Sequence, residues 1–189
     1  MKKGFGLITV ILLLTGCTQN PSPERVMTAN IVSASNSEQL KQADQSFNPA
    51  NLLTLSDAEQ ILGEKCRLTD SSTMVAGKNM NFTSSFTAIS QDKKSGKTGA
   101  LYFLFEAYDQ ISAAQKKYSY IKTANEDHPG VMEIKGLGDE AYFHTDSVNF
   151  YFVMVRKSNK VFNMKVNKIT SNTSLTKFQL ITNKIANKL

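Results

Sequence analysis

The order of apolar patterns predicts a single α+β domain on an antiparallel sheet, spanning residues 52–189. Three segments repeat apolar residues at a spacing of three to four, which is typical of amphipathic helices. Between them lie two groups of short segments in which apolar and polar residues alternate, as they do in strands. Strands grouped between helices favour an antiparallel sheet with packed helices over a parallel one.

The first predicted element is a short helix that ends at Gly63, because glycine readily adopts the left-handed conformation that ends helices. Ser56 is the predicted N-cap, since Glu59 follows three residues later and completes a capping box. The pattern then predicts a first strand over residues 66–69 and a loop over residues 71–79.

A hairpin and a second helix are expected next. Residues 80–90 alternate apolar and polar side chains, residues 91–98 are polar, and residues 99–107 are strongly apolar. This pattern predicts two antiparallel strands joined by a turn. Residues 109–124 carry one apolar helical stripe that includes Tyr118, so we expect this ring to be buried.

The last part of the chain predicts further strands and a final helix. A short strand is expected at residues 131–134. The strand at residues 148–155 is apolar on both sides, so we expect it to be central and covered on both faces. Its partner at residues 161–166 alternates apolar side chains with Asn and Lys, which predicts one solvated face. Residues 171–189 form the predicted final helix.

Residues 1–16 have the three parts of a secretory signal peptide: basic residues, a short apolar core and small residues before a cleavage site. The apolar run 7–14 is far shorter than the roughly 20 residues of a membrane-spanning helix. Its ending, Leu14-Thr15-Gly16-Cys17, resembles the lipobox of bacterial lipoproteins. The resemblance implies cleavage after Gly16, attachment of diacylglyceryl and palmitate to Cys17, and anchoring at the membrane by lipid.

The anchor sets the expected location and the chemistry of the second cysteine. Thr18 and not Asp follows Cys17, and by analogy with lipoprotein sorting this favours the outer membrane, at its periplasmic face or surface. Residues 17–51 are rich in Pro, Ser, Asn and Gln, which predicts a flexible tether. Lipidation of Cys17 leaves Cys66 without an internal partner, so this thiol is expected to be a small buried hydrophobe.

Basic residues gather at the end of the chain, where residues 147–189 hold eight Lys or Arg and no Asp or Glu. Arg156, Lys157, Lys160 and Lys165 fall on one predicted hairpin and form a candidate surface for an envelope partner. The favoured alternative is that the basic residues pair with acidic neighbours in the folded domain. Nucleic-acid binding is not expected, because export removes the opportunity and the basic excess is modest.

The most distinctive internal stretch is Gly136-Leu137-Gly138-Asp139-Glu140-Ala141-Tyr142. Gly136 and Gly138 permit positive φ, and Asp139 can accept backbone hydrogen bonds, so we predict a structural turn into a strand. With the early helix, this stretch resembles a loose group of uncharacterised exported bacterial domains, often lipoproteins. The resemblance covers about residues 52–189 and implies a curved antiparallel sheet with packed helices, but no established activity.

Catalytic and metal-binding patterns are sparse. A metal or acid–base site can be drawn from His144 with Asp139, Glu140 and Asp146, but a solvated strand end is the favoured interpretation. We therefore predict no metal and no cofactor.

The leading hypothesis for the function is a non-enzymatic, lipid-anchored binding or interaction domain of the cell envelope. Its partner would be an envelope protein, a glycan or a small apolar ligand. The alternative is a hydrolase or metal-dependent enzyme that uses His144. A second alternative is a structural lipoprotein that spaces or stiffens the envelope.

Overall fold

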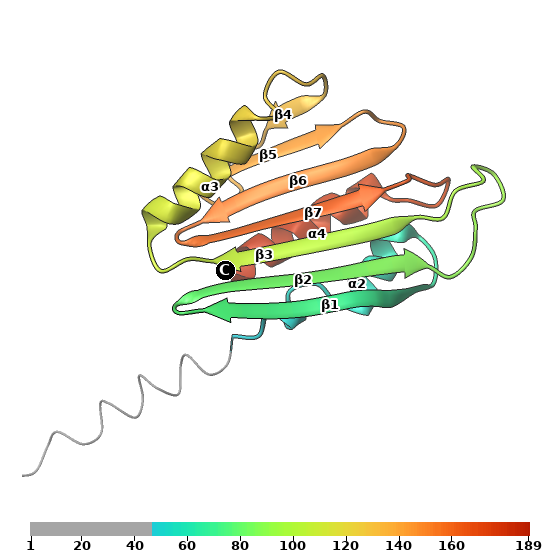
Figure 1. Ribbon diagram of the computed structural model, residues 1–189. Helices are drawn as coiled ribbons and strands as arrows, with labels where there is room; N and C mark the ends of the chain where they lie inside the picture. Colours follow the sequence, from blue (N-terminus) through green and yellow to red (C-terminus); the bar gives the residue numbers. More distant parts are fainter. Residues whose placement is uncertain (1–46) are drawn as a thin grey trace, which may run out of the picture. The chain divides into compact units, whose positions relative to one another are not determined.

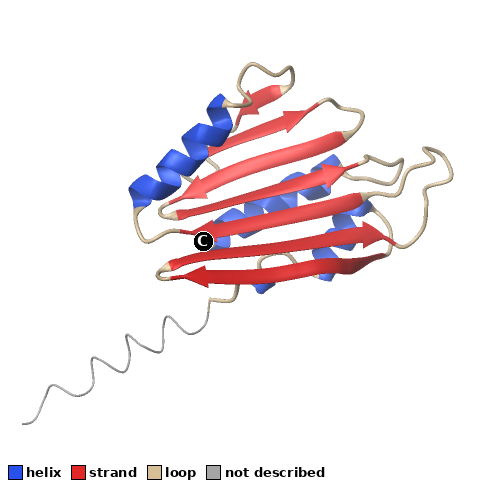
Figure 2. Cartoon of the chain, viewed as in Figure 1, coloured by secondary structure: helices blue, strands red, loops and turns tan. Residues whose placement is uncertain are grey.

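The computed structural model describes residues 47–189, which form one antiparallel sheet with helices on both faces (Figures 1 and 2). The seven strands run in the order β1-β2-β3-β7-β6-β5-β4, and every neighbouring pair is antiparallel. The predicted α+β class, with three packed α-helices, is confirmed. The strands are β1 (Cys66–Ala76), β2 (Asn79–Ala88), β3 (Ala100–Ala107), β4 (Val131–Glu133), β5 (Glu140–Thr145), β6 (Phe150–Lys157) and β7 (Lys160–Asn167). The helices are η1 (Pro49–Asn51, a 3₁₀ turn), α2 (Leu55–Leu62), α3 (Ile111–Thr123) and α4 (Leu175–Lys188).

The larger core lies between the sheet and the helices α2 and α4, which Figure 1 shows behind the strands. Alternation along each strand sends every second side chain to this face, as the pleat requires. The side chains that meet there are mostly aromatic and branched, and they include Phe82, Phe86, Phe103, Phe105, Phe143, Val153, Phe162, Phe178 and Ile185. Burial of this apolar surface is the main stabilising contribution to the fold.

Helix α3 covers part of the opposite face, in front of the strands in Figure 1. Tyr118 is buried as predicted, and its ring meets the ring of Tyr142 edge-on, with centroids 5.9 Å apart. Met154 of β6 packs in the same cluster, while its neighbours Val153 and Val155 face the larger core. The prediction that this strand is interior and covered on both sides is confirmed.

The N-cap of α2 is Thr54, not the predicted Ser56. The Thr54 hydroxyl accepts a hydrogen bond from the backbone N–H of Asp57, and the Asp57 carboxylate accepts one from the backbone N–H of Thr54. Asp57 thus takes the part in the capping box that the sequence pattern assigned to Glu59. Gly63 ends the helix as predicted, with φ of +73°.

The predicted loop at residues 71–79 is mostly strand. β1 continues to Ala76, and each residue from Ser71 onward pairs with β2. This strand forms the edge of the sheet, and its side chains after Cys66 are exposed on both faces. An edge strand of this kind has no buried face, so it carries no apolar alternation from which it could be predicted.

Among the described residues, the folded domain already includes Phe47, five residues before the predicted boundary near Leu52. The Phe47 ring lies 5.3 Å from the ring of Phe105, and Lys160 lies over it at 4.8 Å. Pro49 and Leu52 are buried. The last five residues of the predicted tether, 47–51, therefore belong to the domain.

Candidate functional site

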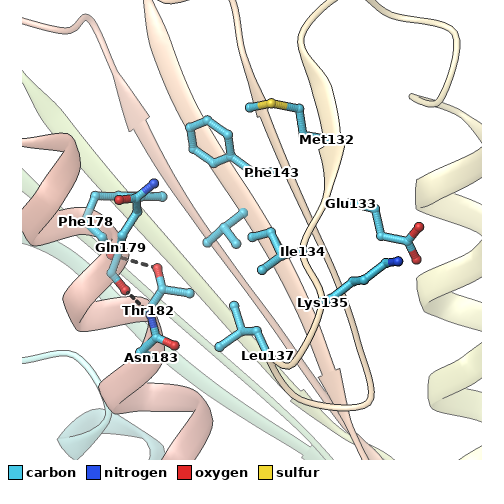
Figure 3. A pocket seen from close by; sticks show the side chains of 11 residues that line it. Met132, Glu133, Ile134, Lys135, Leu137, Phe143, Phe178, Gln179, Thr182 and Asn183 are labelled. Carbon is cyan, nitrogen blue, oxygen red and sulfur yellow. Dashed lines mark hydrogen bonds between the residues drawn. The ribbon is translucent and has the colours of Figure 1, made fainter.

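A pocket of about 460 Å³ opens between the β4–β5 connection and helix α4 (Figure 3). Its volume falls within the range of roughly 300–1,000 Å³ that is usual for small-molecule sites. Met132, Glu133, Ile134, Lys135, Leu137, Phe143, Val153, Phe178, Gln179, Thr182 and Asn183 line it.

The interior of the pocket is apolar. Phe143 points from β5 to the α4 side of the sheet and forms the floor. Val153 of β6, which belongs to the same core, also lines the pocket. Ile134 and Leu137 form the wall that follows β4, and Phe178 of α4 faces them. The pocket therefore exists because α4 passes beside the β4–β5 connection, at the margin of the larger core.

Polar groups stand on the α4 side of the pocket. The Thr182 hydroxyl donates a hydrogen bond to the Phe178 carbonyl at 2.8 Å, and the Asn183 amide donates to the Gln179 carbonyl at 2.9 Å. Both side-chain oxygens keep the capacity to accept a hydrogen bond. Glu133 and Lys135 point away from the apolar floor, and Glu133 lies 3.9 Å from Lys122 of α3. The arrangement suits a neutral, largely apolar ligand with a hydrogen-bond donor at one end.

The turn at Gly136–Asp139 has the predicted positive φ at both glycines. Gly138 has φ of +63°, and a Cβ there would stand 2.5 Å from the Arg156 carbonyl oxygen. The backbone N–H of Asp139 donates to that same oxygen, and its carboxylate accepts from the backbone N–H of Ser158. The turn thereby fixes Leu137 in the pocket wall. Gly136 also has positive φ, at +77°, but faces open space.

The four basic residues of the predicted interaction surface do not form one surface. Arg156 is buried and donates to the carboxylates of Asp139 and Glu140. Lys157 and Lys160 donate to the backbone carbonyls at the end of α4, those of Ala186 and Leu189. Lys165 lies apart from them, exposed on the sheet and over the Phe150 ring at 5.4 Å. For Arg156, pairing with acidic neighbours is the correct interpretation.

The structure does not assemble the predicted His144 site. Glu140 is engaged by Arg156, and it stands four residues from His144 on one strand, or about 13 Å along it. Hydrogen bonds from the backbone N–H and the side chain of Asn149, and then from the backbone N–H groups of Val148 and Phe150, hold the pKa of Asp146 well below its usual range. Among residues 47–189, no three His, Cys, Asp or Glu side chains gather as a metal site.

Cys66 is buried and unpaired within the described residues, as predicted. Burial, and then the charges of Glu59 and Glu64, raise the pKa of its thiol to about 11. A thiol with so high a pKa is a poor nucleophile near neutral pH.

Comparison of the chain with protein-family models, with curated proteins and with solved structures finds no match. The predicted signal peptide, Gly16, Cys17 and most of the predicted tether lie outside the described residues. Within residues 47–189, no helix has both the length and the apolar character needed to cross a bilayer.

Proposed function

We propose that this protein is a lipid-anchored binding domain of the cell envelope, and that its ligand is a small, neutral, largely apolar molecule. The observation that carries the proposal is the pocket of about 460 Å³ beside α4. Its floor and the wall beside β4 are apolar, and its α4 side offers uncharged acceptors at Thr182 and Asn183. The two charged lining residues, Glu133 and Lys135, point away from the apolar floor, so a charged group on that floor would lose its hydration without a close partner of opposite charge.

The lipobox-like stretch supports the anchored part of the proposal. Lipidation at Cys17 would hold the domain at the outer membrane, at its periplasmic face or surface. Apolar molecules of low solubility partition into that environment, so a binding domain held there would meet them at high local concentration.

The pocket favours ligand binding over a purely structural role, for which no such cavity is needed. The engagement of Glu140 by Arg156, and of Asp146 by its own turn, favours binding over a hydrolase centred on His144.

A fluorescence titration tests the pocket. The neutral probe N-phenyl-1-naphthylamine has an apolar body and one N–H donor. It would be added to the mature chain carrying Cys17→Ser, which keeps the protein free of lipid. We expect saturable binding, weakened at least tenfold by Gln179→Trp, which fills the mouth of the pocket. The matched control is Leu180→Trp, at the next residue of α4, which is 57% exposed and does not line the pocket. Equal binding by the two variants would show that the pocket is not the site.

A separate experiment tests the anchor. Cells fed with labelled palmitate should incorporate it into the wild-type chain and not into Cys17→Ser, and only the wild type should fractionate with membranes. Label in both variants would contradict lipidation at Cys17.

A further inference from the structure

One wall of the pocket belongs to a weakly attached segment, the β4 strap, defined as residues 125–135. It follows α3 and includes the short strand β4, and it contributes Met132 and Ile134 to the pocket lining. The attachment to β5 consists of three residue pairs, from Val131↔His144 to Glu133↔Tyr142. Backbone hydrogen bonds at the two ends add to it, from Thr145 to Gly130 and from Ile134 to Ala141. Short, exposed edge elements with few bonds open at low free-energy cost.

A histidine pair fastens the strap on the face opposite the pocket. His128 of the strap stacks on His144 of β5, with ring centroids 5.9 Å apart and an interplanar angle of 13°. The ring of Phe150 meets His144 edge-on at 4.8 Å. His144 also pairs with Val131 in the ladder, and its neighbour Phe143 forms the pocket floor. The stack therefore joins the strap to β5 beside the residues that shape the pocket.

The surroundings of His144 disfavour its protonation. Besides His128, the titratable and charged groups that face His144 are Asp146 and Lys165. Burial and then His128 lower the pKa of His144, and Lys165 adds to this effect. The Pro129 backbone and the Asp146 carboxylate act in the opposite direction without reversing it. A positive charge on His144 would lie in a partly buried site beside the near-parallel ring of His128, with the two centroids 5.9 Å apart.

We propose that the stacked His128–His144 pair is a pH-sensitive latch, which holds the β4 strap closed at neutral pH and releases it when His144 is protonated. Release would move Met132 and Ile134 away from the pocket and free its ligand. This last step rests on the proposed function, whereas the latch itself does not.

The direction of the pH response follows from the lowered pKa of His144. The open state, in which the imidazole is solvated, binds a proton more readily than the closed state. The closed state is thus fully stabilised above the ordinary histidine pKa of 6.5. This stabilisation is lost as the pH falls from there through the lower pKa of the closed state. Opening is therefore an acid response.

Hydrogen–deuterium exchange of the ligand-free mature chain carrying Cys17→Ser tests the latch. After correction for intrinsic rates, peptides from residues 125–135 should exchange several-fold faster at pH 5.0 than at pH 7.5. Peptides from β6 and β7 should show no such change. In His128→Phe, which keeps a stacked ring without a titratable group, the acceleration should be clearly smaller, because burial of His144 remains but the charge of His128 is gone. His128→Gln serves as a second variant if the phenylalanine disturbs folding.

Acceleration of equal size in the wild type and both variants, or spread over the whole sheet, would overturn the latch. The binding assay separates this failure from that of the proposed function. If N-phenyl-1-naphthylamine binds at pH 7.5, and the wild type releases more of it at pH 5.0 than His128→Phe does, both inferences hold. If exchange accelerates as expected but the probe binds at neither pH, the latch stands and the ligand-binding proposal fails.

Discussion

Asp57→Ala is expected to lower the free energy of unfolding by about 2–3 kcal/mol, an estimate that combines lost capping with a lost charged hydrogen bond. The Asp57 carboxylate is buried and accepts hydrogen bonds from the Thr54 backbone at 3.0 Å and from the Lys184 ammonium at 2.7 and 2.9 Å. Loss of the cap costs about 1 kcal/mol. Loss of a hydrogen bond to a charged group costs about 1.5–3 kcal/mol. For the bond to Lys184 we take the lower end of this range, because the Lys184 side chain is 43% exposed and its ammonium becomes hydrated in the variant.

Urea denaturation of the chain carrying Cys17→Ser measures this change, with Glu59→Ala as the control. Glu59 stands on the same helix, but its partner Lys65 is 81% exposed. Breaking this pair should cost at most about 0.5 kcal/mol. If the two variants prove equally stable, the bond between Asp57 and Lys184 does not hold α2 against α4.

The pH dependence provides a second check on Asp57. Burial raises its pKa, but hydrogen bonds from Lys184 and Thr54 outweigh burial and hold the pKa below the ordinary 3.8. The contribution of the Asp57 carboxylate to the free energy of unfolding is thus complete above pH 3.8. It is lost as the pH falls through the lower pKa of the folded state. The stability difference between wild type and Asp57→Ala should shrink on acidification, and a constant difference would refute the assignment.

Three further predictions concern the turn, the buried arginine and the free thiol. Gly138→Ala should destabilise the domain by about 3 kcal/mol in urea denaturation, because it adds steric conflict to backbone strain, whereas Gly136→Ala should cost about 1 kcal/mol; equal costs would contradict the close approach to Arg156. Arg156→Ala should lower the free energy of unfolding by about 2–3 kcal/mol, near the low end for a broken buried ion pair, because Asp139 is 47% exposed. Unchanged stability would show that Arg156 is not a buried partner of these carboxylates. In the chain carrying Cys17→Ser, Cys66 should react with Ellman's reagent at pH 8 at least a hundredfold more slowly in the native state than in urea, because a pKa of about 11 leaves little thiolate; rapid native labelling would show that the thiol is accessible.

Most helices and strands could be predicted from local patterns in the sequence. The stripe that includes Tyr118 and the two-sided apolar strand around Met154 were predicted because each needs only its own periodicity. The strand order was not predicted, since pairing of β3 with β7 joins segments far apart in the chain. Ser71 to Ala76 was missed because an exposed edge strand has no buried face to mark it.

The candidate site was predictable only in part, for a related reason. The turn at Gly138 has a local signature, so its structural role could be predicted. The pocket has none, because Gln179 and Thr182 of α4 line it only once the helix packs beside β4. Arg156 was expected on a surface because it is charged. Its pairing opposite Glu140 depends on the register of β5 and β6, which the sequence does not reveal.

The central claim is that a small neutral ligand occupies the pocket beside α4. The most direct measurement is an amide chemical-shift map of the chain carrying Cys17→Ser, titrated with N-phenyl-1-naphthylamine at pH 7.5. We expect saturable shifts centred on residues that line the pocket: Ile134, Leu137, Thr182 and Asn183. Shifts centred instead around Tyr102 and Lys165, on the exposed face of the sheet, would contradict it.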